Sequence, residues 1–199
     1  MTATRPLRAD AARNRQLLLT AASQEFAERG FDVSIADIAR RAGIAKGTVF
    51  RHFPTKDDLI SAIIVDQVIA LTEVGERLLD APDAGAALLQ FLTTAARELR
   101  QLDLSFLTGA ADPAAEVVET EQRLYATIHA LVDRARDQGD LRPDITGTDV
   151  VALMCAPNHV VKSLPDASPD LWRRYLGIIF DGLRPQGAHP LPHPPPLPL

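Results

Sequence analysis

The stretch Ser34–Asp58, SIADIARRAGIAKGTVFRHFPTKDD, predicts two short helices joined by a tight turn. Ser34 is a favourable N-cap for the first helix, because its hydroxyl accepts a hydrogen bond from an amide of the first turn. The first helix is expected to stop at Gly43, in a tight glycine-containing turn. The second helix is expected over Lys46–His52, and Pro54 prevents its continuation.

The apolar residues of this stretch repeat at the spacing of helices that are buried on one side. They are Ile35, Ile38, Ala39 and Ala42 in the first helix, and Val49 and Phe53 around the second. The polar side of the second helix carries Lys46, Thr48, Arg51 and His52. A pair of helices with this pattern is typical of the helix-turn-helix unit, whose second helix enters the major groove of DNA.

Positive charge surrounds the second helix. Lys46 begins it and Lys56 follows it, and lysines in such positions neutralise DNA phosphates, which gives affinity but little sequence choice. Gly47 leaves the start of the helix open, so that the backbone can come close to a phosphate.

The segment resembles the N-terminal domain of the TetR family of bacterial regulators. The resemblance covers Leu17–Leu59, about a fifth of the chain, in the correct order and spacing, and rests on the motifs FAERGF (26–31), IADIA (35–39), AGI (42–44) and KGTVFRHFPTK (46–56). It implies that Thr48, Phe50, His52 and Lys56 contact DNA and that Ser34 touches a phosphate.

Three positions depart from the family pattern. Ala45 stands where serine is frequent, which removes a hydroxyl cap. Phe50 stands where tyrosine is usual, which removes a hydrogen bond to phosphate, and His52 replaces a second tyrosine but keeps a donor. The full set of expected DNA-binding residues is Ser34, Lys46, Gly47, Thr48, Phe50, Arg51, His52 and Lys56.

Helical periodicity continues on both sides of this stretch, so the chain is expected to be all-α. A first helix is expected over 10–29, and Thr55 is expected to cap a long fourth helix that reaches about Leu79. Further helices are expected over 84–101, 114–138, 148–163, with a kink at Pro157, and 169–183.

Three parts follow from this pattern. Residues 1–55 form a helix-turn-helix DNA-binding domain of three helices, 56–184 a helical effector-binding and dimerisation domain, and 185–199 a proline-rich flexible tail. The segments LRPDITGTDVVALM (141–154) and WRRYLGIIFDGLRP (172–185) look like one ligand-domain subgroup of the same family. That resemblance implies a homodimer built on the last two helices.

The charge distribution agrees with a DNA-binding head. The net charge is −5, yet residues 1–60 contain 10 Lys or Arg and 7 Asp or Glu, which gives +3 and leaves −8 for the remainder. A basic head suits phosphate, whereas the acidic body is expected not to touch DNA.

Several classes of function lack support in the sequence. Cys155 is the only cysteine, so the chain has no internal disulfide, which fits the cytoplasm, and this residue is expected to be buried packing. The polar N-terminus lacks a signal core, and no apolar run is long enough to span a membrane. No metal site, cofactor motif or catalytic constellation is recognisable, so the chain is expected not to be an enzyme and to need no cofactor.

The sequence therefore predicts a homodimeric repressor that binds double-stranded operator DNA and is released by a small-molecule effector. Candidate residues of an apolar effector pocket are Phe91, Phe106, Tyr125, His129 and Asn158. Activation in place of repression stays open. Two other classes also stay open: a helical ligand-binding module that no longer binds DNA, and a small helical enzyme.

Overall fold

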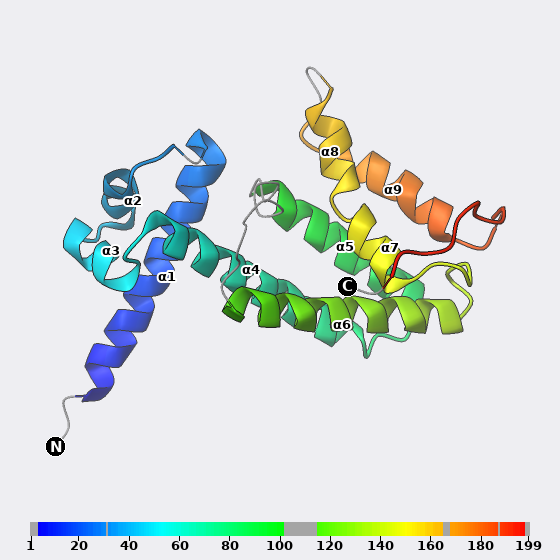
Figure 1. The fold of residues 1–199 in the computed structure, drawn as a ribbon, viewed down its shortest axis with the longest axis horizontal. Helices are drawn as coiled ribbons and strands as arrows, with labels where there is room; N and C mark the ends of the chain where they lie inside the picture. Colours follow the sequence, from blue (N-terminus) through cyan, green and yellow to red (C-terminus); the bar gives the residue numbers. More distant parts are fainter. Residues whose placement is uncertain (1–3, 31, 102–114, 165–167, 187, 198–199) are drawn as a thin grey trace. The chain divides into compact units, whose positions relative to one another are not determined.

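The computed structural model describes residues 4–30, 32–101, 115–164, 168–186 and 188–197, and within these ranges every regular element is a helix. The prediction of an all-α chain is confirmed. The helices are α1 (Thr4–Arg29), α2 (Ile35–Ala42), α3 (Lys46–His52), α4 (Lys56–Leu78), α5 (Ala84–Gln101), α6 (Ala115–Asp137), α7 (Gly147–Leu153), α8 (Ala156–Lys162) and α9 (Trp172–Leu183) (Figure 1). None of them has the length and apolar character that a membrane span requires.

The chain divides into two compact units, and the boundary falls inside α4, between residues 66 and 67. Of the described residues, the first unit contains 4–30, 32–66 and 101, and the second contains 67–100 and the described residues from 115 onward. Each unit has its own apolar core.

The first unit is built around α1, against which α2 packs, and α3 follows after a sharp turn (Figure 1). Its core contains Leu18, Phe26, Ile38, Val49, Phe53 and Leu59. One buried charge also links α1 to α2: the carboxylate of Glu25, only 6% exposed, lies 3.1 Å from Arg29 and 3.4 Å from Arg41. The pair of guanidinium groups compensates the burial of this carboxylate.

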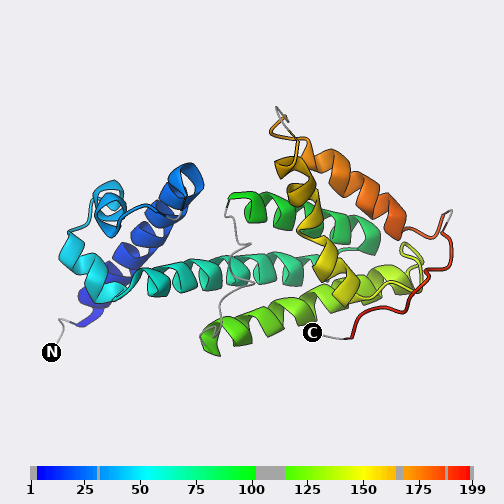
Figure 2. The same ribbon diagram turned by 45° about the horizontal axis from the view of Figure 1, so that its top comes forward.

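In the second unit, the C-terminal half of α4 lies between α5 and α6 (Figure 2). Gly75 of α4 makes this close approach possible. A Cβ at this position would lie 2.6 Å from Cγ2 of Thr127 on α6 and 3.1 Å from the ring of the fully buried Phe91 on α5. Any side chain at position 75 would therefore separate the three helices.

The C-terminal end of α6 is attached to the turn between α4 and α5. Arg134 donates to the carbonyl oxygens of Leu78 (3.3 Å) and Ala81 (2.7 Å). Gln138 accepts from the amide of Ala84 at 3.0 Å. These bonds satisfy backbone groups at two helix ends, which have no partner within their own helices.

Two expectations for residues 148–163 were wrong. The single kinked helix is instead two helices, α7 and α8, separated at Met154 and Cys155. Pro157 explains the break, because it has no amide proton to donate to the carbonyl of Leu153 and its ring crowds that group. Cys155 lies in the break and is exposed, not buried.

Two helix boundaries also differ from the prediction. Helix α1 begins at Thr4, earlier than the expected start at residue 10, and α9 begins at Trp172, after the expected start at 169. The described part of the proline-rich segment is neither helix nor strand, and the Arg142 guanidinium donates to the carbonyl of His189 in it.

Candidate nucleic-acid interface

Helix α2 begins and ends at the residues that the sequence indicates. The Ser34 hydroxyl accepts from the amide of Asp37 (3.2 Å) and donates to its carboxylate (2.8 Å). The hydrogen bond from the Ser34 hydroxyl is the main cause of a lowered pKa of the Asp37 carboxyl group. A hydrogen bond from Arg40 lowers this pKa further. At the other end Gly43 adopts φ 66°, in the left-handed region, and turns the chain toward α3.

Helix α3 is held by its buried side, which directs the opposite side to solvent. Val49 is fully buried and anchors the helix in the core of the first unit. The N-cap residue Ala45 makes no side-chain hydrogen bond, as the missing serine implies. The exposed residues of α3 are Lys46, Gly47, Phe50 and Arg51, and Thr48 is half-buried.

A capping box fixes the start of α4 directly after α3. The Thr55 hydroxyl accepts from the amide of Asp58 at 3.1 Å, and the Asp58 carboxylate accepts from the amide and the hydroxyl of Thr55 at 2.9 and 2.7 Å. These bonds lower the pKa of Asp58. Lys56, the first residue of α4, has its ammonium 5.7 Å from the ring centroid of Phe26.

The cations of α2 and α3 fall into two groups. The arginines around α2 are paired within the protein: Arg40 lies 2.5 Å from Asp37, and Arg41 lies 2.7 Å from Glu28. In contrast, Lys46 and Arg51 of α3 form no ion pair with any residue in the described ranges. Of these two helices, α3 is therefore the one that carries positive charge not neutralised within the protein.

An exposed aromatic ring lies beside this charge. The Lys46 ammonium is 5.7 Å from the ring centroid of Phe50, whose side chain is 43% exposed. A phenyl ring exposed to water on a short helix is suited to apolar contact with a sugar or a thymine methyl group.

His52 faces a different environment from its neighbours. Its Nε2 is buried without a hydrogen-bond partner, and its ring centroid is 6.2 Å from that of Phe53. That nitrogen therefore faces the protein interior. Any DNA contact by His52 must use another part of its half-exposed ring.

Of the residues predicted to line an effector pocket, those that the structure describes each have their own packing or hydrogen-bond contacts in the second unit. Phe91 is fully buried against Gly75, and His129 lies against Gly147. Asn158 donates from Nδ2 to the carbonyl of Ala96 at 2.7 Å, whereas its Oδ1 is buried and no partner for it exists in the described part of the chain. Phe106 lies outside the described residues.

Tyr125 belongs to a small polar group that the sequence did not single out. Burial raises the pKa of its phenol, and the charges of Glu121 and Cys155 raise it further. Burial also raises the pKa of Glu121. The four-residue spacing between Glu121 and Tyr125, which places both on one face of α6, was the signal available in the sequence.

Metal chemistry has no visible support. In the ranges that the structure covers, no cluster of three or more His, Cys, Asp or Glu side chains has an arrangement that could hold a metal ion.

Both parts of the chain match known families. Residues 18–63 match the profile of bacterial regulatory proteins of the tetR family. Residues 80–185 match the profile of the C-terminal domain of SbtR-like transcriptional regulators.

Individual relatives agree with these profiles. HTH-type transcriptional repressor Rv1474c of Mycobacterium tuberculosis is 30% identical over 183 residues, which cover 87% of this chain and 81% of that protein. HTH-type transcriptional repressor Rv3405c of the same species is 52% identical over 48 residues, and this match spans only 26% of that protein.

A solved structure shows the same fold. The TetR transcription regulatory protein from Mycobacterium vanbaalenii is 33% identical to this chain, with a TM-score of 0.66 over 90% of this chain and 99% of that one. With matching profiles for both parts and relatives that span most of its length, the chain belongs to the TetR family of DNA-binding transcriptional regulators.

Proposed function

We propose that this chain is a homodimeric repressor that reads operator DNA with α3 and leaves it when a small molecule binds the second unit. The observation that carries the proposal is the charge pattern of α2 and α3. The arginines around α2 are paired internally, whereas Lys46 and Arg51 on α3 have no carboxylate partner in the described ranges.

On DNA, α3 would lie in the major groove. Lys46 and Lys56 would bind phosphates, which releases counterions and makes binding salt-dependent. Thr48 and Phe50 would lie against the groove, where a hydroxyl and an apolar ring give sequence preference. The Ser34 hydroxyl and the open backbone at Gly47 would add contacts to phosphates.

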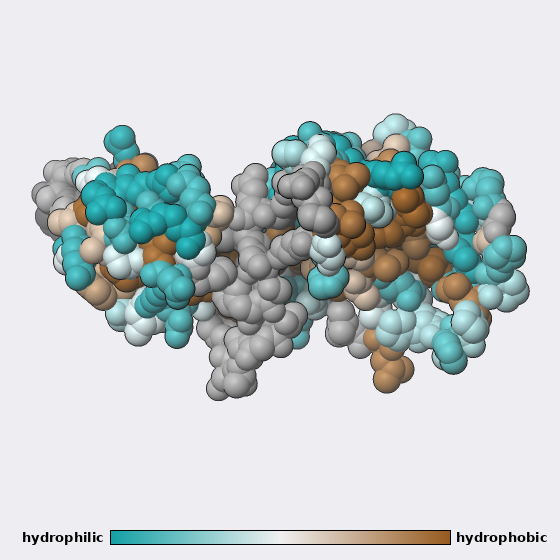
Figure 3. Space-filling view, turned by 90° about the horizontal axis from the view of Figure 1, so that it is seen from above, coloured by the Kyte–Doolittle hydropathy of each residue, from teal (hydrophilic) through white to brown (hydrophobic). Residues whose placement is uncertain are grey.

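Dimerisation would use the face of α8 and α9. Apolar side chains gather on this face of the second unit (Figure 3), and the exposed ones include Val160 (38%), Leu164 (38%) and Ile178 (54%). Beside them a groove of about 430 Å³ is lined by Ile145, Leu153, Ile178, Ile179 and Leu191, among others. A second copy related by a two-fold axis would cover this surface.

The effector would bind among polar groups that the protein leaves partly unsatisfied. The buried Oδ1 of Asn158 has no partner in the described part of the chain, and Glu121 and Tyr125 are desolvated. An unpaired buried acceptor is costly unless a ligand supplies a donor. The ligand would therefore carry a hydrogen-bond donor on a largely apolar body.

Helix α4 is suited to couple the two events, because it starts in the first unit and ends in the second. A change in its tilt would alter the spacing of two recognition helices in a dimer. Coupling of about 1–3 kcal/mol would weaken operator binding roughly 5- to 150-fold. The effector must bind the DNA-incompetent state more tightly, since equal affinity for both states shifts nothing.

Selection of bound duplexes from a random pool tests the proposal. A dimer with two reading helices should enrich a pseudo-palindrome whose half-sites are roughly 34–36 Å apart or a multiple of that distance. Recovery of no common sequence would favour the alternative of a helical ligand-binding module that no longer binds DNA. An enzyme would require a convergent catalytic set, for which the described residues give no support.

A further inference from the structure

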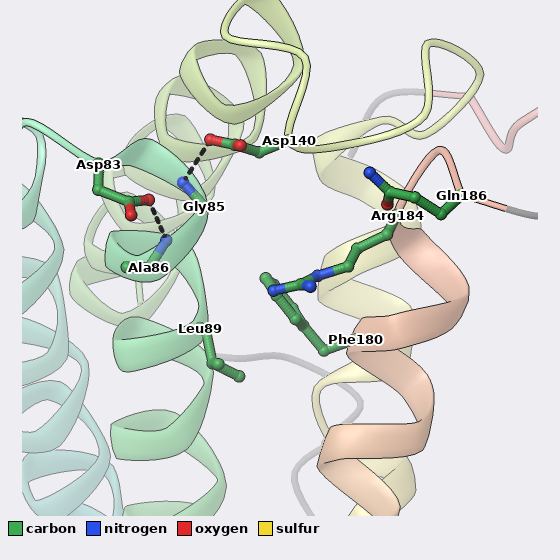
Figure 4. Close-up of a pocket in the computed structure, with 8 residues that line it drawn as sticks. All are labelled: Asp83, Gly85, Ala86, Leu89, Asp140, Phe180, Arg184 and Gln186. Atoms are coloured by element: carbon green, nitrogen blue, oxygen red, sulfur yellow. Dashed lines mark hydrogen bonds between the residues drawn. The ribbon is translucent and has the colours of Figure 1, made fainter.

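The second unit contains a cavity that is separate from the candidate effector residues. It is open to solvent, lies between the start of α5, the turn after α6 and the end of α9, and has a volume of about 240 Å³. Figure 4 shows the residues that line it, which are Asp83, Gly85, Ala86, Leu89, Asp140, Phe180, Arg184 and Gln186.

One wall of the cavity carries two carboxylates. Asp83 accepts from the amide of Ala86 at 2.7 Å through Oδ1, and Asp140 accepts from the amide of Gly85 at 3.0 Å through Oδ2. The amide of Ala84 is bonded to Gln138, so these amides at the start of α5 already have partners. The second oxygen of each carboxylate can therefore accept a hydrogen bond from a ligand. The amides at the start of α5 are not available to a ligand.

The approach of Asp140 to α5 depends on a glycine. A Cβ at Gly85 would lie 2.9 Å from Cβ of Asp140 and 3.0 Å from its Cγ and Oδ2. A side chain at position 85 would therefore displace this carboxylate from the cavity wall.

The other wall carries a guanidinium group on an aromatic ring. Arg184 lies over Phe180, with its Cζ 5.4 Å from the ring centroid, and its side chain extends from α9 toward α5 (Figure 4). Arg184 forms no ion pair with the residues described. Arg173, on the same helix, also lies over an aromatic ring, that of Trp172 at 4.7 Å, but it is paired with Asp170 at 3.3 Å.

We propose that this cavity binds a small zwitterion, with its amine between the carboxylates of Asp83 and Asp140 and its acidic group on Arg184. A simple cation would satisfy the two carboxylates but would be repelled by the guanidinium. A simple anion would be held by Arg184 and repelled by the two carboxylates. Only a molecule with both charges complements both walls, through charge-assisted hydrogen bonds at each end.

Calorimetric titration of the full chain with a series of ω-amino acids, from glycine to 6-aminohexanoate, tests this site. Butylammonium and butyrate are the single-charge controls. At least one zwitterion should bind about tenfold more tightly than either control, because each control loses one charge-assisted contact. Absence of binding by every zwitterion, or equal binding of a control, would overturn the proposal.

Substitutions locate the site. D83N and D140N keep an oxygen for the caps of α5 and should each weaken binding about tenfold, as should R184Q. R173Q removes the matched arginine outside the cavity and should leave the affinity unchanged. If R184Q binds as wild type does, or R173Q has the same effect as R184Q, the zwitterion does not bind here. The repressor function proposed above does not depend on either result.

Discussion

The imidazole of His129 occupies the space next to Gly147: a Cβ on Gly147 would lie 2.5 Å from Cγ of His129 and 2.6 Å from its Nδ1. Helix α7 thus begins in direct contact with α6, and glycine is the residue that allows it. His129 therefore has a clear packing role in the second unit, whether or not it also meets a ligand.

G147A should destabilise the protein by about 1–3 kcal/mol, because an added methyl group at a close helix contact forces the neighbours apart. The measurement is urea unfolding at one fixed protein concentration. G177A in α9 is the control, since a Cβ at Gly177 meets no atom within 4 Å. Adding H129A to G147A should recover part of the loss, and no recovery would show that the imidazole is not the obstacle.

A45S should stabilise the first unit by about 0.5–2 kcal/mol, because it supplies the side-chain cap that α3 lacks. S34A is the opposite change, because it removes the side-chain cap of α2. It removes the oxygen that accepts from the amide of Asp37 at 3.2 Å, and it should cost a similar amount. Thermal unfolding of the two variants beside wild type should therefore show shifts of opposite sign. Shifts of the same sign would contradict the role assigned to these caps.

T55V should raise the pKa of Asp58 toward its ordinary value of 3.8, because the Thr55 hydroxyl is the main cause of the lowered pKa. A lowered folded pKa means that the carboxylate stabilises the fold above pH 3.8 and that this contribution disappears as the pH falls through the folded value. T55V should therefore lose less stability in acid than wild type.

NMR titration of the side-chain carboxyl groups checks this prediction. The lowered pKa of Asp37 is the internal control, since its main cause is Ser34 and not Thr55. An unchanged titration of Asp58 in T55V would show that the hydroxyl does not set it.

I178D should convert a dimer into a monomer, because it would place an unpaired charge within the proposed interface. Ile178 is 54% exposed in the single chain, so the change should leave the monomer folded. I69D is a matched control at an isoleucine of α4 that is 41% exposed. Sedimentation should show a monomer for I178D and a dimer for I69D and wild type. A monomeric wild type would rule out this interface.

The sequence predicts the structure best where a helix begins or ends at residues that are close together along the chain. The cap at Ser34, the end of the helix at Gly43 and the capping box of Thr55 with Asp58 each depend on residues within four positions of one another. Those signals define α2, α3 and the start of α4 without any information on packing. Helical periodicity predicted the remaining helices, apart from the break at Met154 and Cys155, and the comparisons support the all-helical fold over most of the chain.

Features that depend on distant residues were not predictable from spacing. Asp83, Asp140 and Arg184 line one cavity although they come from three separate elements. The contact of His129 with Gly147 also joins two helices, and neither residue carries a pattern that indicates the other. The orientation of His52 was missed for a related reason, because the burial of its Nε2 depends on its surroundings in the fold and not on its position in α3.

The most direct measurement is the affinity of the K46A and R40A variants for the selected operator duplex, by fluorescence anisotropy at several salt concentrations. Lys46 has no internal carboxylate partner among the described residues, whereas Arg40 is bonded to Asp37 at 2.5 Å. K46A should weaken binding about tenfold or more and reduce the slope of log affinity against log salt by about 1, and R40A should change both far less. Equal effects of the two substitutions, or unchanged binding by K46A, would contradict the assignment of α3 as the DNA-reading helix.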